Sequence, residues 1–260
     1  MSDKTILRKS RNILSGFLHI LLNILLGVGS VLITFLSGTY LFGILLVLLS
    51  KWRIFAVRPR YLWLNIKSNL VDLIVGISFV LLAYVSGTTL LPVHFLLAAL
   101  YTLWLLFLKP RRSDFATEFQ ALAAVFLGST ATILLTASAN AWLTELLIFL
   151  IAYSASRHIL IQSDDTDFSI IPLVVALLSA ELTWALSPWL IVYSFNSPGI
   201  IIPQLSVLLT LMIFGFNRTY RSIIKHDGVL KFSDIYAPVL FCILMSLIIF
   251  IGFSKPIFNV

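Results

Sequence analysis

The sequence has little charge and almost no cysteine. Of its 260 residues, 11% are charged and 60% are hydrophobic, and the mean hydropathy is +1.03. Soluble domains carry about 25% charged residues, so this composition excludes an ordinary water-soluble globule. The single cysteine, Cys242, lies inside an apolar run, so no intrachain disulfide can form. The chain is therefore predicted to be an integral membrane protein.

The sequence also lacks the motifs of common soluble catalysts. It contains no Walker A sequence, no H-E-x-x-H zinc helix and no G-x-S-x-G nucleophile elbow. The longest polar connections, residues 58–68 and 217–234, are too short to form a soluble domain. Any function is therefore expected to reside in the membrane bundle or at its rim.

The few basic residues have a regular distribution. Lys and Arg form five clusters, at residues 4–11, 51–67, 109–112, 157–158 and 218–231. The apolar stretches between the clusters are long enough for two crossings each, so the chain returns to one basic side after every pair. Basic residues at helix ends are retained on the cytoplasmic face. The net charge of +7 therefore indicates orientation and contact with anionic headgroups rather than nucleic acid.

Apolar runs of about 20 residues divide the chain into about nine crossings. The predicted helices cover residues 13–36, 40–57, 69–86, 91–108, 115–136, 141–160, 169–193, 199–217 and 235–254. The first run must turn, and residues 37–39 are the predicted turn, with 27–30 as the competing position. The predicted fold is an all-α, polytopic transmembrane helix bundle in one integral membrane domain, residues 1–260. Its N-terminus is expected in the cytoplasm and its C-terminus outside, and the charge pattern favours a bacterial plasma membrane.

Aromatic and basic side chains near the predicted helix ends are expected to anchor the bundle. Trp52, Trp63, Trp142 and Trp189 occupy such positions, which are typical of interfacial aromatic residues. Lys51 is expected to snorkel to the interface from the end of the second helix.

One ionisable residue lies near the centre of a predicted helix. Glu181 is about midway along helix 169–193, where a carboxylate costs about 2.5–3.5 kcal/mol unless it is paired, protonated or hydrated. Trp184 follows one turn later, and Pro188, a further turn on, frees the carbonyl of Trp184. These residues predict an intramembrane polar site for a proton or cation, or a protonated Glu181 bonded to a neighbouring helix. Glu145, near the outer end of helix 141–160, is a weaker candidate.

Small and polar residues form a stripe on helix 13–36. His19, Asn23, Gly27 and Ser30 recur at intervals of three or four residues, which places them along one side of the helix. Such a stripe faces protein rather than lipid. Close helix packing is the first interpretation, because small residues dominate membrane helix interfaces, and a cavity wall is the alternative.

Oxygen ligands occur on two predicted cytoplasmic connections. Asp164, Asp165 and Asp167 lie between the sixth and seventh helices, and Asp72 lies at the start of the third. Together they could hold a hard cation such as Mg²⁺. The alternative is a solvated loop with polar caps at the helix ends.

This layout resembles that of the UbiA-type membrane prenyltransferases. The shared features are nine crossings, a cytoplasmic N-terminus and polar motifs after helices two and six. The resemblance implies a Mg²⁺-diphosphate held by two Asp-rich motifs. Where the family has an Asn followed by several acids, this chain has Asn65, Asn69 and Asp72, and its acids at 164–167 are bunched rather than one helical turn apart.

Three functions are compatible with the sequence. The favoured one is a small-molecule or ion transporter, or a subunit of one, built around Glu181 and needing no cofactor. The second is a membrane-embedded transferase that acts on a lipid or diphosphate substrate at the cytoplasmic face with Mg²⁺. The third is a structural or assembly subunit in which Glu181 pairs with another membrane protein or a second copy.

The last basic cluster has a helical spacing of its own. Arg218, Arg221 and Lys225 recur at intervals of three and four, which predicts one basic helical face. This face would lie on anionic headgroups, or it would simply belong to a positively charged cytoplasmic loop.

Overall fold

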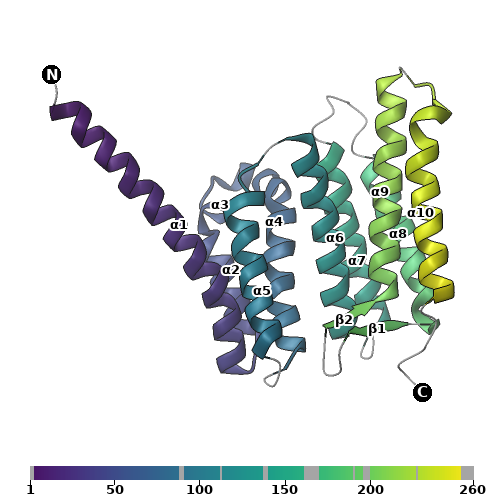
Figure 1. Cartoon of the computed structure of the whole chain (residues 1–260), viewed down its shortest axis with the longest axis horizontal. Coiled ribbons are helices and arrows are strands. Elements are labelled where there is room, and N and C mark those ends of the chain that lie inside the picture. Colours follow the sequence, from purple (N-terminus) through teal and green to yellow (C-terminus); the bar gives the residue numbers. More distant parts are fainter. Residues whose placement is uncertain are drawn as a thin grey trace.

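The computed structural model describes residues 3–87, 91–111, 113–136, 140–160, 170–189, 191–195, 200–226 and 228–252. Within these ranges the chain is almost entirely helical, and successive long helices run in alternating directions (Figure 1). We call the end of the bundle that holds Lys51, Lys109 and Lys225 the basic end. The opposite end carries a small β-hairpin and is called the hairpin end.

The elements follow one another along the chain with short connections. They are α1 (Asp3–Ser37), α2 (Tyr40–Ser50), α3 (Trp52–Phe55), α4 (Pro59–Val85), α5 (Leu91–Leu103), the π-helix η1 (Trp104–Leu108), α6 (Asp114–Thr136), α7 (Ala141–Leu160), α8 (Ile170–Leu186), the 3₁₀-helix η2 (Ser187–Trp189), β1 (Val192–Phe195), β2 (Ile200–Pro203), α9 (Gln204–Lys225) and α10 (Phe232–Gly252).

Several of these helices are those of an integral membrane protein. Six of the described helices are long and apolar enough to cross a membrane, namely Ser15–Ser37, Pro59–Val85, Asp114–Thr136, Ala141–Leu160, Ile170–Trp189 and Phe232–Phe250. Two shorter apolar helices, Tyr40–Ser50 and Pro92–Leu108, accompany them. The predicted helical membrane fold is thus supported, whereas the count of nine crossings and the side of each terminus stay predictions.

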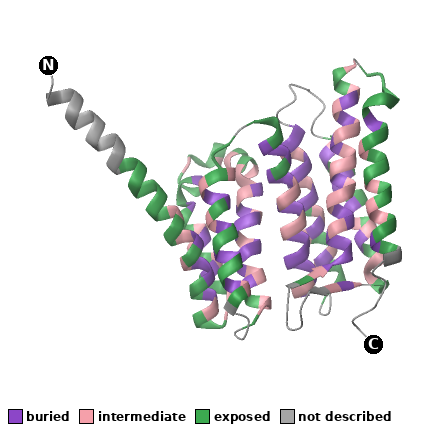
Figure 2. Cartoon of the chain, viewed as in Figure 1, coloured by how far each residue is buried: buried purple, intermediate pink, exposed green. Residues whose placement is uncertain are grey.

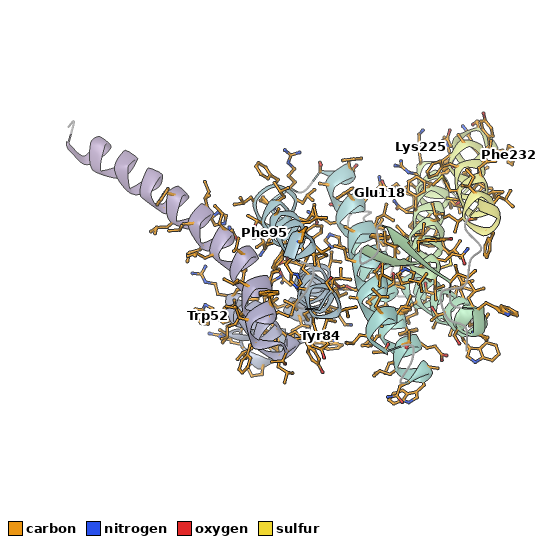
Figure 3. All side chains as sticks on the ribbon, turned by 60° about the horizontal axis from the view of Figure 1, so that its bottom comes forward. Trp52, Tyr84, Phe95, Glu118, Lys225 and Phe232 are labelled. Carbon is orange, nitrogen blue, oxygen red and sulfur yellow. The ribbon has the colours of Figure 1, made fainter. Side chains whose placement is uncertain are left out.

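The outside of the bundle is rich in apolar side chains. Trp52, Phe95 and Phe232 are 60%, 74% and 78% exposed and point away from the helices (Figure 3). Helix α10 is exposed over most of its surface, whereas the central helix α6 is largely buried (Figure 2). Such a surface is unfavourable in water and is solvated by lipid tails in a membrane.

The turn between the first two long helices lies where the sequence predicts it. Helix α1 ends at Ser37, and Gly38 adopts a φ of +63°, which glycine reaches without the clash that a Cβ causes. Thr39 then caps α2, because its Oγ1 accepts a hydrogen bond from the Leu41 amide at 3.2 Å. The competing turn at residues 27–30 is wrong, since α1 continues through it.

Two apolar cores hold the helices together. The first is built by α1, α2, α4, α5 and η1 and includes Val75 and Tyr101, both fully buried. The second is built by α6, α7, α8 and α9 and includes Ile148 and Ile213. Helix α4 packs against α6, which joins the two cores into one bundle (Figure 1).

The end of the predicted helix 169–193 and the start of the predicted helix 199–217 are wrong, because the chain between them forms a 3₁₀-helix and two strands. Helix α8 ends at Leu186, and Pro188 lies in η2 because a proline has no N–H to continue a helix. Residues 192–195 and 200–203 form an antiparallel hairpin, with Val192 opposite Pro203, and the three consecutive isoleucines at 200–202 favour a strand. Helix α9 starts after Pro203 and continues to Lys225, eight residues beyond the predicted end at 217.

Three other predicted boundaries also shift. Helix α1 begins at Asp3 rather than 13, and α2 ends at Ser50 rather than 57, with the single turn of α3 after it. Helix α4 begins at Pro59 rather than 69, because proline fits the first turn of a helix, where its missing N–H has no partner to lose.

Candidate functional site

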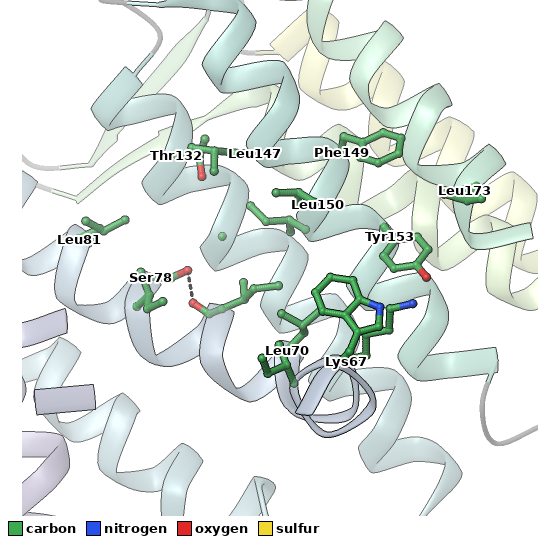
Figure 4. A pocket seen from close by; sticks show the side chains of 16 residues that line it. Lys67, Leu70, Ser78, Leu81, Thr132, Leu147, Phe149, Leu150, Tyr153 and Leu173 are labelled. Atoms are coloured by element: carbon green, nitrogen blue, oxygen red, sulfur yellow. Dashed lines mark hydrogen bonds between the residues drawn. The ribbon is translucent and has the colours of Figure 1, made fainter. Parts of the chain in front are cut away.

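A groove of about 560 Å³ runs along the flank of the bundle between α4 and α7 (Figure 4). Helix α6 supplies the buried residues Gly128 and Thr132 to it, and Leu173 of α8 closes one side. Trp63 and Leu150, which also line the groove, are 65% and 49% exposed. The groove therefore opens sideways, toward the position of the surrounding lipid.

The α4 wall of the groove follows from the helical period. Its residues Lys67, Leu70, Ile74, Ser78 and Leu81 recur at intervals of three or four and so share one face of α4. The Ser78 hydroxyl donates to the Ile74 carbonyl at 2.6 Å, so the helix satisfies it internally (Figure 4). Most of this wall is therefore apolar.

The narrowness of the groove at α6 depends on Gly128. A Cβ at this position would lie 3.0 Å from Ile74 Cγ2 and 3.1 Å from Ile151 Cδ1. These distances are shorter than ordinary van der Waals contact, so the glycine allows α4 and α7 to approach α6 from both sides. The groove is thus formed by three helices that meet around one small residue.

The groove has a cation near its mouth at the basic end of the bundle. Lys67 lines it there, and its Nζ lies 5.0 Å from the centre of the Trp63 ring, within the range of a cation–π contact. No carboxylate among the described residues forms an ion pair with Lys67. Within the described ranges, the charge of this ammonium group is thus not balanced by a carboxylate.

A buried ion cluster lies in the first core near the basic end. Lys51 Nζ lies 2.5 Å from Asp72 Oδ2 and donates to the Asp72 carbonyl at 2.8 Å, and Lys109 Nζ lies 3.0 Å from the same Oδ2. Trp104 Nε1, placed by the π-helix η1, donates to Asp72 Oδ1 at 3.3 Å. The cluster ties the C-terminal end of α2 and the segment around η1 to the middle of α4, and it surrounds the Asp72 carboxylate with cations.

The prediction that Lys51 snorkels to the interface is wrong. Its side chain is only 4% exposed, because the ammonium turns inward to Asp72. Burial lowers the pKa of Lys51 from its ordinary value of 10.5 to about 8, although the negative charge of Asp72 acts in the opposite direction.

A second ion cluster lies between α6 and α9, also near the basic end. The side chain of Glu118 is 5% exposed (Figure 3), and its Oε2 lies 3.2 Å from Arg218 Nη2 and 3.7 Å from Arg221 Nη1. The predicted basic face is thus part of α9 itself, and two of its cations turn toward α6. Lys225, the third, lies 3.4 Å from Asp234 Oδ2 at the start of α10.

The residues of the predicted intramembrane polar site lie on the outside of the bundle. Glu181 and Trp184 are exposed on α8, and Pro188 is exposed in η2. Glu145 is half-buried on α7, and no hydrogen bond or ion pair within the described ranges joins it to Glu181. The role of Glu181 as a proton or cation site stays a prediction.

The predicted stripe of helix one divides into two parts. Gly27 and Ser30 are buried, and a Cβ on Gly27 would collide with Thr102 Oγ1 and lie 3.1 Å from the Thr102 Cα. These residues therefore serve close packing of α1 on α5. His19 is exposed on the part of α1 that projects from the bundle, and Asn23 Nδ2 donates to the His19 carbonyl at 2.9 Å (Figure 1).

The predicted metal ligands lie in two different situations. Asp164, Asp165 and Asp167 fall outside the described residues. Asp72 is described, and its carboxylate is bound by Lys51, Lys109 and Trp104. The asparagines that precede it bond to backbone, Asn65 to the Ile54 carbonyl at 2.9 Å and Asn69 to the Asn65 carbonyl at 2.8 Å. A Mg²⁺ site stays a prediction.

Sequence reasoning missed the groove and the Glu118 cluster. The spacing of Lys67, Leu70, Ile74 and Leu81 was visible, but a stripe of apolar residues on a membrane helix does not distinguish a groove from a packed face. Glu118, one turn into α6, resembles an ordinary acid near the start of a helix.

Comparison with protein-family models, with curated proteins and with solved structures finds no match to this chain. The class of protein is therefore described from the structure alone. The chain has the long apolar helices of an integral membrane protein, with a lateral apolar groove that has a cation near its mouth.

Proposed function

We propose that the protein binds a lipid with one long apolar tail and an anionic headgroup, and presents that headgroup at the basic end of the bundle. The observation that carries the proposal is the groove between α4 and α7, which is apolar along its length and has Lys67 at one mouth. Its volume of about 560 Å³ lies in the usual range of ligand sites, about 300–1,000 Å³.

The shape of the groove favours a single extended chain. Trp63 and Leu81 mark its extremes on α4, and 18 residues of helix at 1.5 Å each span about 27 Å, close to the roughly 30 Å of a hydrocarbon core. Divided by that length, the volume corresponds to a channel roughly 5 Å across. This width is compared with the contact distance between carbon atoms, about 3.5–4.0 Å. One hydrocarbon chain fits such a channel.

The charge at the mouth favours an anionic headgroup. Lys67 has no acidic partner among the described side chains, and Trp63 beside it belongs to the class of aromatic residues that occupy the headgroup level. A headgroup phosphate would therefore gain a charge-assisted hydrogen bond from Lys67 while its tail occupies the groove.

Among the three functions compatible with the sequence, action on a lipid substrate is the one that the groove supports. In this proposal the tail lies along the flank and the headgroup lies at the basic end, where both ion clusters are also found. Transport through the bundle depends instead on Glu181, which is exposed on α8. The lipid-binding proposal includes both a transferase and a lipid carrier.

The tail site is tested by filling the groove. Leu150→Trp adds a large side chain to the groove wall, whereas Leu146→Trp adds the same side chain one turn away on α7, outside the groove. The two leucines are 49% and 47% exposed, so the pair is closely matched. We expect native mass spectrometry of the purified protein to show lipid retained by the wild type and by Leu146→Trp, and lost from Leu150→Trp. Equal retention by both variants would contradict the proposal.

The headgroup site is tested by removing one charge. Lys67→Gln should reduce the preference for anionic over neutral lipid at least about tenfold, because a bond to a charged group contributes about 1.5–3 kcal/mol. Arg60→Gln is the control, since Arg60 is exposed near the same end of α4 and does not line the groove. Loss of the preference in both variants would mean that only the general surface charge matters.

A further inference from the structure

A second pocket, of about 210 Å³, lies at the basic end between α6, α7 and α9. It shares no lining residue with the lateral groove. Its polar lining consists of Asp114 at the start of α6 and of Asn217, Tyr220, Arg221 and Lys225 on α9. The pocket is thus a separate and more polar site.

Asn217 is the most informative residue of this pocket. Its side chain is 1% exposed, and neither Nδ2 nor Oδ1 has a hydrogen-bond partner within the described part of the chain. An amide buried in this way loses its bonds to water and gains none, which proteins rarely tolerate without a bound group. The amide offers one donor nitrogen and one acceptor oxygen to an occupant of the pocket.

The cations of the pocket lie on the same stripe of α9 as Asn217. Arg221 and Lys225 follow it at intervals of four residues, so the three side chains succeed one another at about 6 Å along the helix. Their described acidic contacts are long: Arg221 lies 3.7 Å from Glu118, and Lys225 lies 3.4 Å from Asp234. Asp114 adds one carboxylate to the opposite wall.

We propose that this pocket binds an organic phosphate that also carries a hydroxyl group. The phosphate oxygens would accept from the Arg221 guanidinium, the Lys225 ammonium and Asn217 Nδ2, because a phosphate offers several acceptors where a carboxylate offers two. A hydroxyl next to the phosphate would donate to Asn217 Oδ1. Both a soluble phosphate ester and a hydroxylated phospholipid headgroup have this chemistry.

The first test measures binding of sn-glycerol 3-phosphate to the purified full chain in detergent by isothermal titration calorimetry. Arg221→Gln should weaken binding at least about tenfold, the usual consequence of losing a charge-assisted bond. Lys231→Gln is the matched control, because Lys231 is exposed at the same end and does not line the pocket. Binding that is equally weakened by both substitutions would overturn the site.

Asn217→Leu separates binding from folding. Leucine has a similar size and removes both unpartnered polar atoms, so the variant should unfold at the same or a higher temperature than the wild type while it loses the phosphate ester. A lower unfolding temperature together with unchanged binding would mean that Asn217 is a structural residue bonded to water, and would overturn the proposal.

A second arm distinguishes the two sources of the phosphate. The protein is placed in nanodiscs of phosphatidylglycerol or of phosphatidylcholine, and its unfolding temperature is compared with that of Arg221→Gln. An Arg221-dependent stabilisation by phosphatidylglycerol alone assigns the site to a headgroup, and binding of glycerol 3-phosphate in detergent assigns it to a soluble ester. The absence of both responses overturns the proposal, whatever the result for the lateral groove.

Discussion

At the scale of single residues, Lys51 shows how a charge is held inside this bundle. Its ammonium contacts both the carboxylate and the carbonyl of Asp72, and only 4% of its side chain is exposed. Removing a charged group from water is costly, and attraction between partners repays that cost only with close geometry and further hydrogen bonds. Trp104 and Lys109 supply those additional bonds to Asp72.

The burial of Lys51 predicts a pH-dependent stability. The folded protein holds this amine at a pKa of about 8, below its ordinary 10.5, so between these values the unfolded chain binds more protons. The free energy of unfolding should therefore rise as the pH increases from about 8 to about 10.5, by up to roughly 3 kcal/mol. Below pH 8 this gain is absent, because both states carry the charge.

Thermal unfolding in detergent at several pH values measures this effect. The control is Lys51→Met, which fills the same space without an ionisable group. Its free energy of unfolding should not rise through the loss of a proton from residue 51. An identical pH profile for the two proteins would show that the amine is as basic in the folded chain as in the unfolded one.

At the scale of elements, close helix contact depends on small residues placed at crossings. Gly27 lets α1 lie against the backbone of α5 at Thr102, and Gly43 of α2 lies equally close to the Ser30 carbonyl, 3.1 Å from the position of a Cβ. Between helices in lipid, such close approach and its van der Waals contacts replace the hydrophobic effect as the source of association.

Two glycines on α1 allow a matched test of this packing. A methyl group at Gly27 would collide with Thr102, whereas at Gly29 it would meet only Leu46 Cδ2, at 3.7 Å. Gly27→Ala should lower the free energy of unfolding by about 1–3 kcal/mol through overpacking. Gly29→Ala should leave it unchanged or raise it by up to about 1 kcal/mol through helix propensity. Thermal unfolding of both variants checks this, and equal stability of the two would remove the special role of Gly27.

Helix α9 joins a segment that packs in the core to a segment that carries cations, without a break between them. Its first turns lie in the second core, with Leu209 and Ile213 buried, and its last turns carry Arg218, Arg221 and Lys225. Because the helix does not break at 217, the cations are held at fixed positions relative to α6. Both the Glu118 cluster and the pocket proposed to bind a phosphate ester depend on this continuity.

At the scale of the whole molecule, two packed cores meet along α4 and α6 and leave the groove at their flank. The basic end and the hairpin end differ in charge, since Lys51, Lys109 and Lys225 follow or close helices that end at the basic end. From the positive-inside rule we predict that the basic end lies in the cytoplasm. A headgroup bound at Lys67 would then face the cytoplasm.

This orientation is tested by cysteine labelling in a Cys242→Ser background. Asn140 precedes α7 at the hairpin end, and Val229 lies between α9 and α10 at the basic end, where it is 62% exposed. We expect a membrane-impermeant maleimide to label Asn140→Cys in intact cells and Val229→Cys only after permeabilisation. The reverse pattern would place the basic end outside and invert the bundle.

The class of the protein, most of its helices and the turn at residues 37–39 could be predicted from the sequence alone. These depend on local quantities, the run length of apolar residues and the backbone freedom of Gly38, which act within a few turns of chain. The sequence did not predict the hairpin, because residues 192–195 become a strand only when residues 200–203 pair with them.

Which polar residues meet depends on how the helices pack against one another. Lys51 pairs with Asp72 and Glu118 pairs with Arg218, across 21 and 100 residues of sequence, whereas the buried amide of Asn217 has no hydrogen-bond partner within the described part of the chain. The groove likewise needs α4, α6 and α7 to approach around Gly128. Such partners depend on packing between distant segments, whose energies are set by shape and burial rather than by the local pattern of residues.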